Sequence, residues 1–180
     1  MRRSRSILNQ QSLLILYYSF VLPYLSYCVE VWGNTYKTNL LPLYILQKRA
    51  IRTVFNARIH DHTNLLFLKA SALKFFDLVK FKTAQIIYKV NNNLLPNTIK
   101  NLFQERDSCR KYVLRGKLRL KQQRVRSTLK RMCISVEGVI LWNSLDSEVK
   151  LSKNVNQFKR KFRKGVFEIY NREEKERKKK

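Results

Sequence analysis

The chain has 180 residues, of which 38 are Lys or Arg and 12 are Asp or Glu, so its formal net charge is +26. A charge of this size opposes compaction and favours a polyanionic partner, for which nucleic acid is the first candidate. Hydrophobic residues make up 44% of the chain and aromatic residues 12%, which excludes a fully disordered basic tail. Because there are only 4 Gly and 3 Pro, we expect a mainly α fold rather than a turn-rich sandwich or barrel.

Residues 10–32 are predicted to form a helix that bends or restarts at Pro23, because proline lacks an amide donor and clashes with the preceding turn. Residues 6–29 carry no charge, which also resembles a signal peptide or a short membrane span. Polar residues within this stretch, and the lack of a small-residue cleavage site after it, favour a buried helix. A membrane anchor over residues 7–29 is the alternative.

A second helix is predicted over residues 40–57, with Pro42 in its first turn. Its apolar residues recur at helical spacing: Leu43, Leu46, Ala50 and Val54. Lys48, Arg49 and Arg52 flank this apolar stripe, a pattern suited to packing on a core while contacting a phosphate backbone. An ordinary solvated helix face is the other interpretation of the same pattern.

Two further helices complete a first helical region that we expect to span residues 1–103. Residues 74–90 are strongly apolar and are predicted to form a central core helix. Three asparagines at 91–93 and Pro96 mark its end, and residues 97–103 are predicted to add a short helix.

The composition shifts at Gln104, where a basic C-terminal region over residues 104–170 is predicted to begin. Residues 110–131 contain ten Lys or Arg and no acid. Lys or Arg alternates with Leu over residues 117–121, and this period of two predicts a strand with one basic face. Residues 132–136 are predicted as the second strand of a small basic β-ribbon, and residues 139–145 as a helix that covers it.

A basic amphipathic helix is predicted from Asn154 onward, because apolar residues recur every three or four positions among Lys and Arg. Such a helix suits a nucleic acid, an acidic membrane or a partner groove alike. Residues 171–180 are mixed in charge and lack an apolar anchor, so they are predicted to be a disordered tail.

Residues suited to catalysis or metal binding are sparse. The acids are scattered, no two aspartates are adjacent, the glycines are isolated and there are 2 His. We therefore expect no catalytic site, no metal site and no cofactor. Cys28, Cys109 and Cys133 form no CxxC pair and fit a reducing intracellular compartment.

Three stretches of the chain together resemble one protein family. The first is LYYSFVLPYLSYC at residues 16–28, with VWGN at 31–34; the second is LQKRAIR at 46–52, followed by His62-Thr63. The third comprises ISVEGV at 134–139, LWNSL at 141–145 and Phe158-Lys159. Their order and spacing resemble the region downstream of the catalytic palm in reverse transcriptases of LINE-type, non-LTR retrotransposons.

The resemblance implies a thumb-like helical region in which Lys48, Arg49 and Arg52 contact the phosphates of a template–primer duplex. In that family the polymerase aspartates and the endonuclease lie upstream, so this chain would be a non-catalytic C-terminal fragment of an RNA-directed DNA polymerase. Its start at Met1, near the palm boundary, suggests a truncated element copy. The implied partners are RNA, an RNA–DNA or DNA duplex, and an upstream palm and fingers domain. The implied setting is a cytoplasmic ribonucleoprotein or the nucleus.

The side chains predicted to contact nucleic acid are all basic and come from three parts of the chain. They are Lys48, Arg49, Arg52, Arg115, Lys117, Arg119, Lys121, Arg124, Arg126, Lys130, Arg131, Lys159, Arg160 and Arg163. Two other interpretations of the whole chain stay open. One is a basic membrane-associated protein, and the other is a non-functional product of a truncated element.

Overall fold

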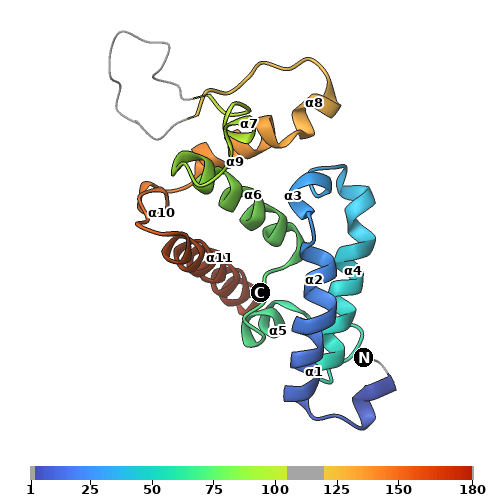
Figure 1. Cartoon of the computed structure of the whole chain (residues 1–180). Helices are drawn as coiled ribbons and strands as arrows, with labels where there is room; N and C mark the ends of the chain where they lie inside the picture. Colours follow the sequence, from blue (N-terminus) through green and yellow to red (C-terminus); the bar gives the residue numbers. More distant parts are fainter. Residues whose placement is uncertain (1–2, 105–119, 180) are drawn as a thin grey trace. The chain divides into compact units, whose positions relative to one another are not determined.

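The computed structural model describes residues 3–104 and 120–179, and these residues are mainly helical (Figure 1). The chain divides into two compact units. Unit 1 comprises Met1–Val29, Thr35–Val79 and Arg163–Lys180, and unit 2 comprises Glu30–Asn34 and Lys80–Phe162. This division differs from the boundary predicted between residues 103 and 104, because α6 (Phe75–Asn91) and α11 (Val155–Lys178) each contribute residues to both units.

The N-terminal stretch is helical, with a π-helical turn just before Pro23, where the sequence predicts a bend; the chain leaves the helix only at Tyr27 and Cys28, a break that was not predicted. After the 3₁₀ turn η1 (Arg3–Ser6) come α1 (Gln10–Leu16), the π-helical turn η2 (Tyr17–Val21), α2 (Leu22–Ser26) and α3 (Val29–Trp32). Pro23 lies in the first turn of α2, where its missing amide hydrogen is tolerated. The turn just before it is π-helical: the Leu22 N–H donates to the Tyr17 carbonyl, five residues earlier. This wider turn leaves room for the proline ring.

Unit 1 is built around the N-terminal helices, α4 (Lys37–Val54) and α5 (Asn64–Lys69). Its core consists of side chains that are almost fully buried: Leu13, Tyr17, Ile51, Val54, Phe67, Ala70 and Ala72. Asn56 and Ser71 follow α4 and α5 with positive φ angles of 53° and 51°. Their left-handed backbone closes the two helices with C-terminal capping turns.

Unit 2 packs the later part of α6 with α7 (Asn97–Lys100), α8 (Thr128–Met132), α9 (Val139–Ser144) and α10 (Ser147–Lys150). Its core is aromatic: the Phe158 ring centroid lies 4.5 Å from that of Tyr88 and 6.3 Å from that of Trp142. A π-helical turn, η4 (Ile134–Gly138), leads from α8 into α9 (Figure 1). A Cβ atom at Gly138 would lie 2.9 Å from the Ile87 Cδ1 atom, so η4 packs closely on α6.

The second strand of the predicted β-ribbon is wrong, because Met132 and residues 134–136 are helical and only Cys133 between them is extended. Met132 ends α8, and Ile134 begins the π-helical turn η4. The Ser127 side chain accepts a hydrogen bond from the Lys130 N–H at 3.2 Å and so starts α8 as a helix. Ser135 and Val136 are buried in unit 2, so packing on α6 decides the conformation of a short apolar run that fits either structure.

The tail predicted to be disordered is also largely ordered, because α11 continues to Lys178. Glu174 is only 4% exposed, and its Oε1 atom lies 2.5 Å from the Arg177 Nη2 atom. Glu173 forms an ion pair with Lys74 at 3.0 Å. Polar and charged contacts therefore hold this end of α11, in place of the apolar anchor that the sequence lacks.

Candidate nucleic-acid interface

Arg52, in the last turn of α4, is held by the loop that follows the helix. Its guanidinium donates from Nε and Nη2 to the Asp61 carbonyl at 3.0 and 2.9 Å. The Asp61 carboxylate accepts a hydrogen bond from the Arg58 N–H at 2.7 Å. The guanidinium of Arg52 thus donates two hydrogen bonds to a single carbonyl oxygen, and this contact holds the loop against the end of α4.

Lys48 lies one turn earlier on α4 and is half-buried. Its ammonium is 4.2 Å from the ring centroid of Tyr44, a cation–π distance. Burial lowers the pKa of Lys48, and the positive charges of Arg52 and Lys74 lower it further. Burial and these two neighbouring charges thus disfavour the charged form of Lys48.

Arg49 differs from its two neighbours on α4. Its side chain is exposed and makes no hydrogen bond or ion pair with another described residue. Of the three residues on this helix that the sequence predicts to contact nucleic acid, Arg49 is therefore the one most accessible to a ligand.

A polar network joins the start of α6 to the end of α11 in unit 1. Besides its ion pair with Glu173, the Lys74 ammonium lies 4.0 Å from the Tyr170 ring centroid. The Tyr170 hydroxyl accepts from the Lys74 N–H at 3.0 Å and donates to the Asp77 carboxylate. Burial, and then the charge of Asp77, raise the pKa of Tyr170. Lys74 is therefore neutralised inside the unit.

The sequence analysis did not find this network, because its members lie far apart in the chain. Lys74 and Tyr170 are 96 residues apart. One local signal exists: Asp77 is the single acid in the apolar stretch 75–91. A lone acid on a core-facing helix indicates a specific partner, although the sequence does not say which one.

The basic segment that leads into α8 has different surroundings. Arg124, Arg126, Lys130 and Arg131 are exposed, and none of these four side chains makes a hydrogen bond or ion pair with another described residue. The Ser127 cap places Lys130 and Arg131 in the last turn of α8. We call these four residues the α8 basic cluster. Lys121, which precedes them, is also exposed and does have an interaction within the protein.

The three basic residues predicted on α11 divide between the two units. Lys159 and Arg160 belong to unit 2, and their side chains make no hydrogen bond or ion pair with described residues. Arg163 belongs to unit 1, where its Nη2 atom donates to the Ser71 carbonyl at 2.6 Å and its guanidinium carbon lies 5.7 Å from the Phe167 ring centroid. Arg163 thus supports the capping turn of α5.

Three predicted contact residues lie outside the described residues: Arg115, Lys117 and Arg119. Of the first predicted strand of the ribbon, residues 117–121, only the last two positions are described. The remaining predicted residues separate by unit. Unit 1 holds Lys48, Arg49, Arg52 and Arg163, and unit 2 holds Lys121, Arg124, Arg126, Lys130, Arg131, Lys159 and Arg160. Each unit therefore presents its own set of cations.

Metal ligands and membrane spans were sought across residues 3–104 and 120–179. Over these ranges no three His, Cys, Asp or Glu side chains gather as a group able to hold a metal ion. No helix there combines the length and apolar character needed to cross a membrane. Cys28 and Cys133 are free thiols with exposed side chains. The feature that distinguishes the described surface is its positive charge.

Comparisons with known proteins do not place the chain in a family: no protein-family model matches it, and neither the curated proteins nor the solved structures contain a significant match. Function is therefore argued from the chain's own residues. The cations described above and the three sequence stretches that resemble reverse transcriptases carry that argument.

Proposed function

We propose that this chain is the thumb and post-thumb portion of a LINE-type retrotransposon reverse transcriptase. In this proposal it binds RNA or a template–primer duplex through phosphates, inside a ribonucleoprotein within the cell. It performs no polymerisation itself, because the catalytic aspartates of such an enzyme belong to a palm domain upstream. The observation that carries the proposal is the α8 basic cluster, four exposed cations without an ion-pair partner among the described residues.

The chemistry of this cluster favours phosphate over a protein or a base edge. Three of its four members are Arg, whose planar fork of donors matches two oxygens of a phosphate. Clustered cations repel one another, and a polyanion both removes that repulsion and releases its own counterions on binding. Such contacts fix position on a nucleic acid without reading its sequence.

The surroundings of the other cations support a division of roles. Arg52 and Arg163 each donate to a backbone carbonyl of the same unit, and Lys74 forms an ion pair with a carboxylate there. We therefore assign these three residues to holding the helices in place. Arg49 and Arg160 are exposed, and we assign them to phosphate contact together with the α8 basic cluster. These assignments are part of the proposal.

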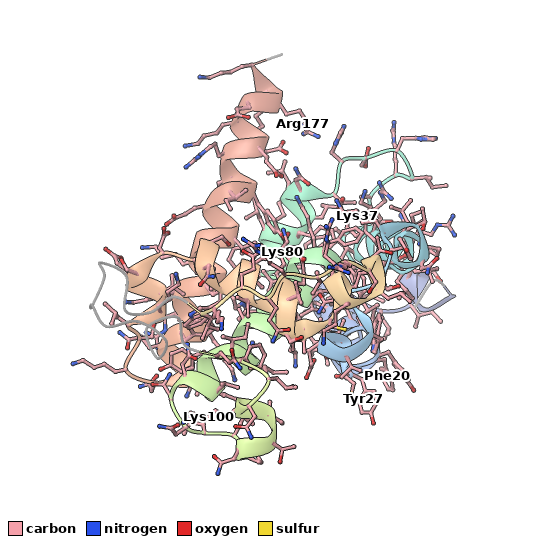
Figure 2. The ribbon with its side chains drawn as sticks, turned by 90° about the horizontal axis from the view of Figure 1, so that it is seen from above. Phe20, Tyr27, Lys37, Lys80, Lys100 and Arg177 are labelled. Atoms are coloured by element: carbon pink, nitrogen blue, oxygen red, sulfur yellow. The ribbon has the colours of Figure 1, made fainter. Side chains whose placement is uncertain are left out.

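An aromatic stripe on the N-terminal helices supports the idea of an adjoining domain. Phe20, Tyr24 and Tyr27 are 60%, 81% and 76% exposed; Phe20 and Tyr24 lie about one turn apart, and Tyr27 is the residue that follows α2. Figure 2 shows Phe20 and Tyr27 projecting outward from this segment. Exposed aromatic groups in a row are typical of a surface that another protein part covers. We propose that the upstream palm and fingers domain covers it.

The same stripe favours a second candidate function, that of an inert truncated product. Without a domain to cover the stripe, the chain would associate through it and aggregate. Replacing all three aromatic residues by Ser distinguishes these cases. A soluble variant that still binds nucleic acid supports the binding module, whereas a soluble variant without binding supports the inert product.

The proposed function is tested by titrating the purified chain against a labelled RNA–DNA primer–template across a salt series, with anionic liposomes as competitor. We expect the logarithm of the affinity to fall linearly with the logarithm of the salt concentration, because phosphate contacts release counterions. Liposomes should compete poorly. Preference for the liposomes, or no binding at about 0.1 M salt, where non-specific binding by so basic a protein should still be measurable, would overturn the proposal.

A further inference from the structure

Unit 2 contains an open pocket of about 540 Å³ near the C-terminal end of α6, a volume within the range of small-ligand sites. Its apolar lining comes from Val90, Phe103 and Leu120, which are 3%, 7% and 3% exposed. These side chains are part of the core and form a fixed apolar floor. The pocket therefore belongs to the scaffold of the unit.

The remaining lining of the pocket is polar and uncharged except for one lysine. Four amide side chains and one ammonium surround the floor: Asn91, Asn93, Asn101, Gln104 and Lys100. Each amide offers both a donor and an acceptor. Among the described residues that line the pocket, one carries a positive charge and none is an acid.

The end of α6 positions one side of the pocket. Leu94 N–H donates to the Lys89 carbonyl at 2.8 Å and Asn93 N–H to the Val90 carbonyl at 3.1 Å, which is the hydrogen-bond pattern of a Schellman cap. Asn93 has a φ of 56°, a left-handed conformation that Asn tolerates. Its Oδ1 atom accepts from the Lys100 Nζ atom at 2.8 Å, so the ammonium on α7 is held beside the pocket that both residues line.

The opposite side of the pocket is anchored by Asn143 of α9. The Asn143 side chain accepts from the Leu120 N–H at 3.0 Å and donates to the Leu120 carbonyl at 3.0 Å. The next residue, Lys121, donates its N–H to the Gln104 carbonyl at 2.7 Å. These bonds hold Leu120 and Lys121 in place beside the pocket. Arg124 and Arg126 follow within a few residues of Leu120, which lines it.

We propose that this pocket binds one unpaired nucleotide of RNA, with its base against the amides and its phosphate near Lys100. The inference rests on the proposed function and adds a specific ligand to it. Unpaired bases expose hydrogen-bonding edges that Asn and Gln amides match, whereas a duplex keeps these edges paired. The Lys100 ammonium suits the attached phosphate, and the nearby arginines suit the phosphates that follow it in the strand.

The test compares a blunt RNA–DNA duplex with the same duplex carrying a short unpaired RNA extension. The wild-type chain should bind the extended duplex about tenfold more tightly, the gain expected from roughly one set of specific hydrogen bonds. A double variant, Asn101→Leu with Gln104→Leu, should lose this preference and keep its affinity for the blunt duplex. Both residues are exposed, and the substitutions leave the net charge unchanged.

The matched control replaces two exposed amides of unit 2 that do not line the pocket, Asn97→Leu with Gln122→Leu. This variant should keep the full preference for the extended duplex. If the wild-type chain binds neither duplex, the proposed function itself fails. If it binds both equally, or if the pocket variant keeps the preference, the pocket proposal is overturned while phosphate binding stands.

A measurement on the wild-type chain guards against a variant that does not fold. Adenosine monophosphate is titrated into the chain while the side-chain amide resonances of Asn and Gln are followed by NMR. The amides that line the pocket should shift together and to saturation. The pocket proposal is wrong if only resonances elsewhere move.

Discussion

Three basic residues of unit 1 and the α8 basic cluster of unit 2 carry the same kind of charge in different surroundings. In unit 1, Arg52, Arg163 and Lys74 each contact an oxygen of the same unit at 3.0 Å or less. In unit 2, the α8 basic cluster makes no such contact with the described residues. A cation with an internal partner stabilises the fold, whereas a cation without one remains available to a ligand.

The difference shows which sequence pattern is informative about binding. The position of residues 48–52 on the flank of a helix indicated exposed cations, yet Arg52 lies close enough to the next loop to donate to the Asp61 carbonyl. An acid-free run such as residues 110–131 contains no acid for its cations to pair with locally. The length of an acid-free basic run is therefore a better guide to an available cation than its position on a helix.

The largest expected effect concerns the α8 basic cluster. Replacing Arg124, Arg126, Lys130 and Arg131 by Gln should weaken binding to an RNA–DNA duplex on the order of 100- to 1,000-fold at about 0.1 M salt, because four phosphate contacts are lost. Fluorescence anisotropy with a labelled duplex measures this change. The matched control removes four positive charges from the end of the chain, at Arg172, Lys175, Lys178 and Lys179. An equal loss in both variants would show that net charge, and not this cluster, governs binding.

The second effect concerns the buried hydroxyl of Tyr17 in unit 1. Burial raises the pKa of Tyr17 to about 12 from its ordinary value of 10.0, so the folded state holds this proton more tightly than the unfolded state. The corresponding stability is present below pH 10 and is lost as the pH rises from 10 to 12. Two pKa units correspond to about 2 to 3 kcal/mol. Urea unfolding of Tyr17→Phe across this window should show a weaker pH dependence than the wild type.

The control for this experiment is Tyr24→Phe, because Tyr24 is 81% exposed. Its unfolding should keep the pH dependence of the wild-type chain. Tyr17→Phe also removes the acceptor of a 3.0 Å hydrogen bond from Gln47, so the comparison is made on the change with pH and not on stability at neutral pH. The account of the unit 1 core is contradicted if both variants behave alike.

The third effect separates the structural role of Arg52 from its charge. Arg52→Lys keeps the charge but loses the two-pronged contact with the Asp61 carbonyl, which should cost about 1 to 2 kcal/mol of stability. Arg49→Lys, three residues away with an exposed side chain, should change stability by less than about 0.5 kcal/mol. Chemical unfolding measures both. Equal stability of the two variants would remove the assigned structural role of Arg52.

The smallest effects come from two glycines with opposite surroundings. A Cβ atom at Gly138 would lie 2.9 Å from the Ile87 Cδ1 atom and 3.2 Å from the Thr83 Cγ2 atom, so Gly138→Ala should destabilise unit 2 by about 1 kcal/mol. Nothing lies within 4 Å of a Cβ atom at Gly165. Gly165→Ala should therefore stabilise α11 by about 0.5 to 1 kcal/mol. Thermal melting of both variants tests the packing of η4 on α6.

The helices were predictable from the sequence because their apolar spacing is long and regular, as in α4 and α6. Residues 132–136 were not, since a run of five residues fits a strand or a helix equally well and only its burial against α6 decides. The end of α11 was missed because Glu173 finds its partner, Lys74, only through the tertiary structure. Local sequence therefore predicts elements well and their termini less well.

The candidate site was predictable to a similar extent. The acid-free basic run identified the α8 basic cluster without any structure. The engagement of Arg163 by Ser71, 92 residues away, and the amides that surround Lys100 depend on contacts that no local pattern encodes. Asn143 lies within the LWNSL stretch, but its hydrogen bonds to Leu120 became visible only in the folded chain.

The most direct test of the central claim is the salt dependence of duplex binding by the wild-type chain and by the variant lacking the α8 basic cluster. Each phosphate contact contributes about 0.9 to the slope of log affinity against log salt on a duplex. The account predicts that the variant's slope is smaller by about 3 to 4. Equal slopes for the two proteins would show that these four residues do not contact phosphate and would contradict the account.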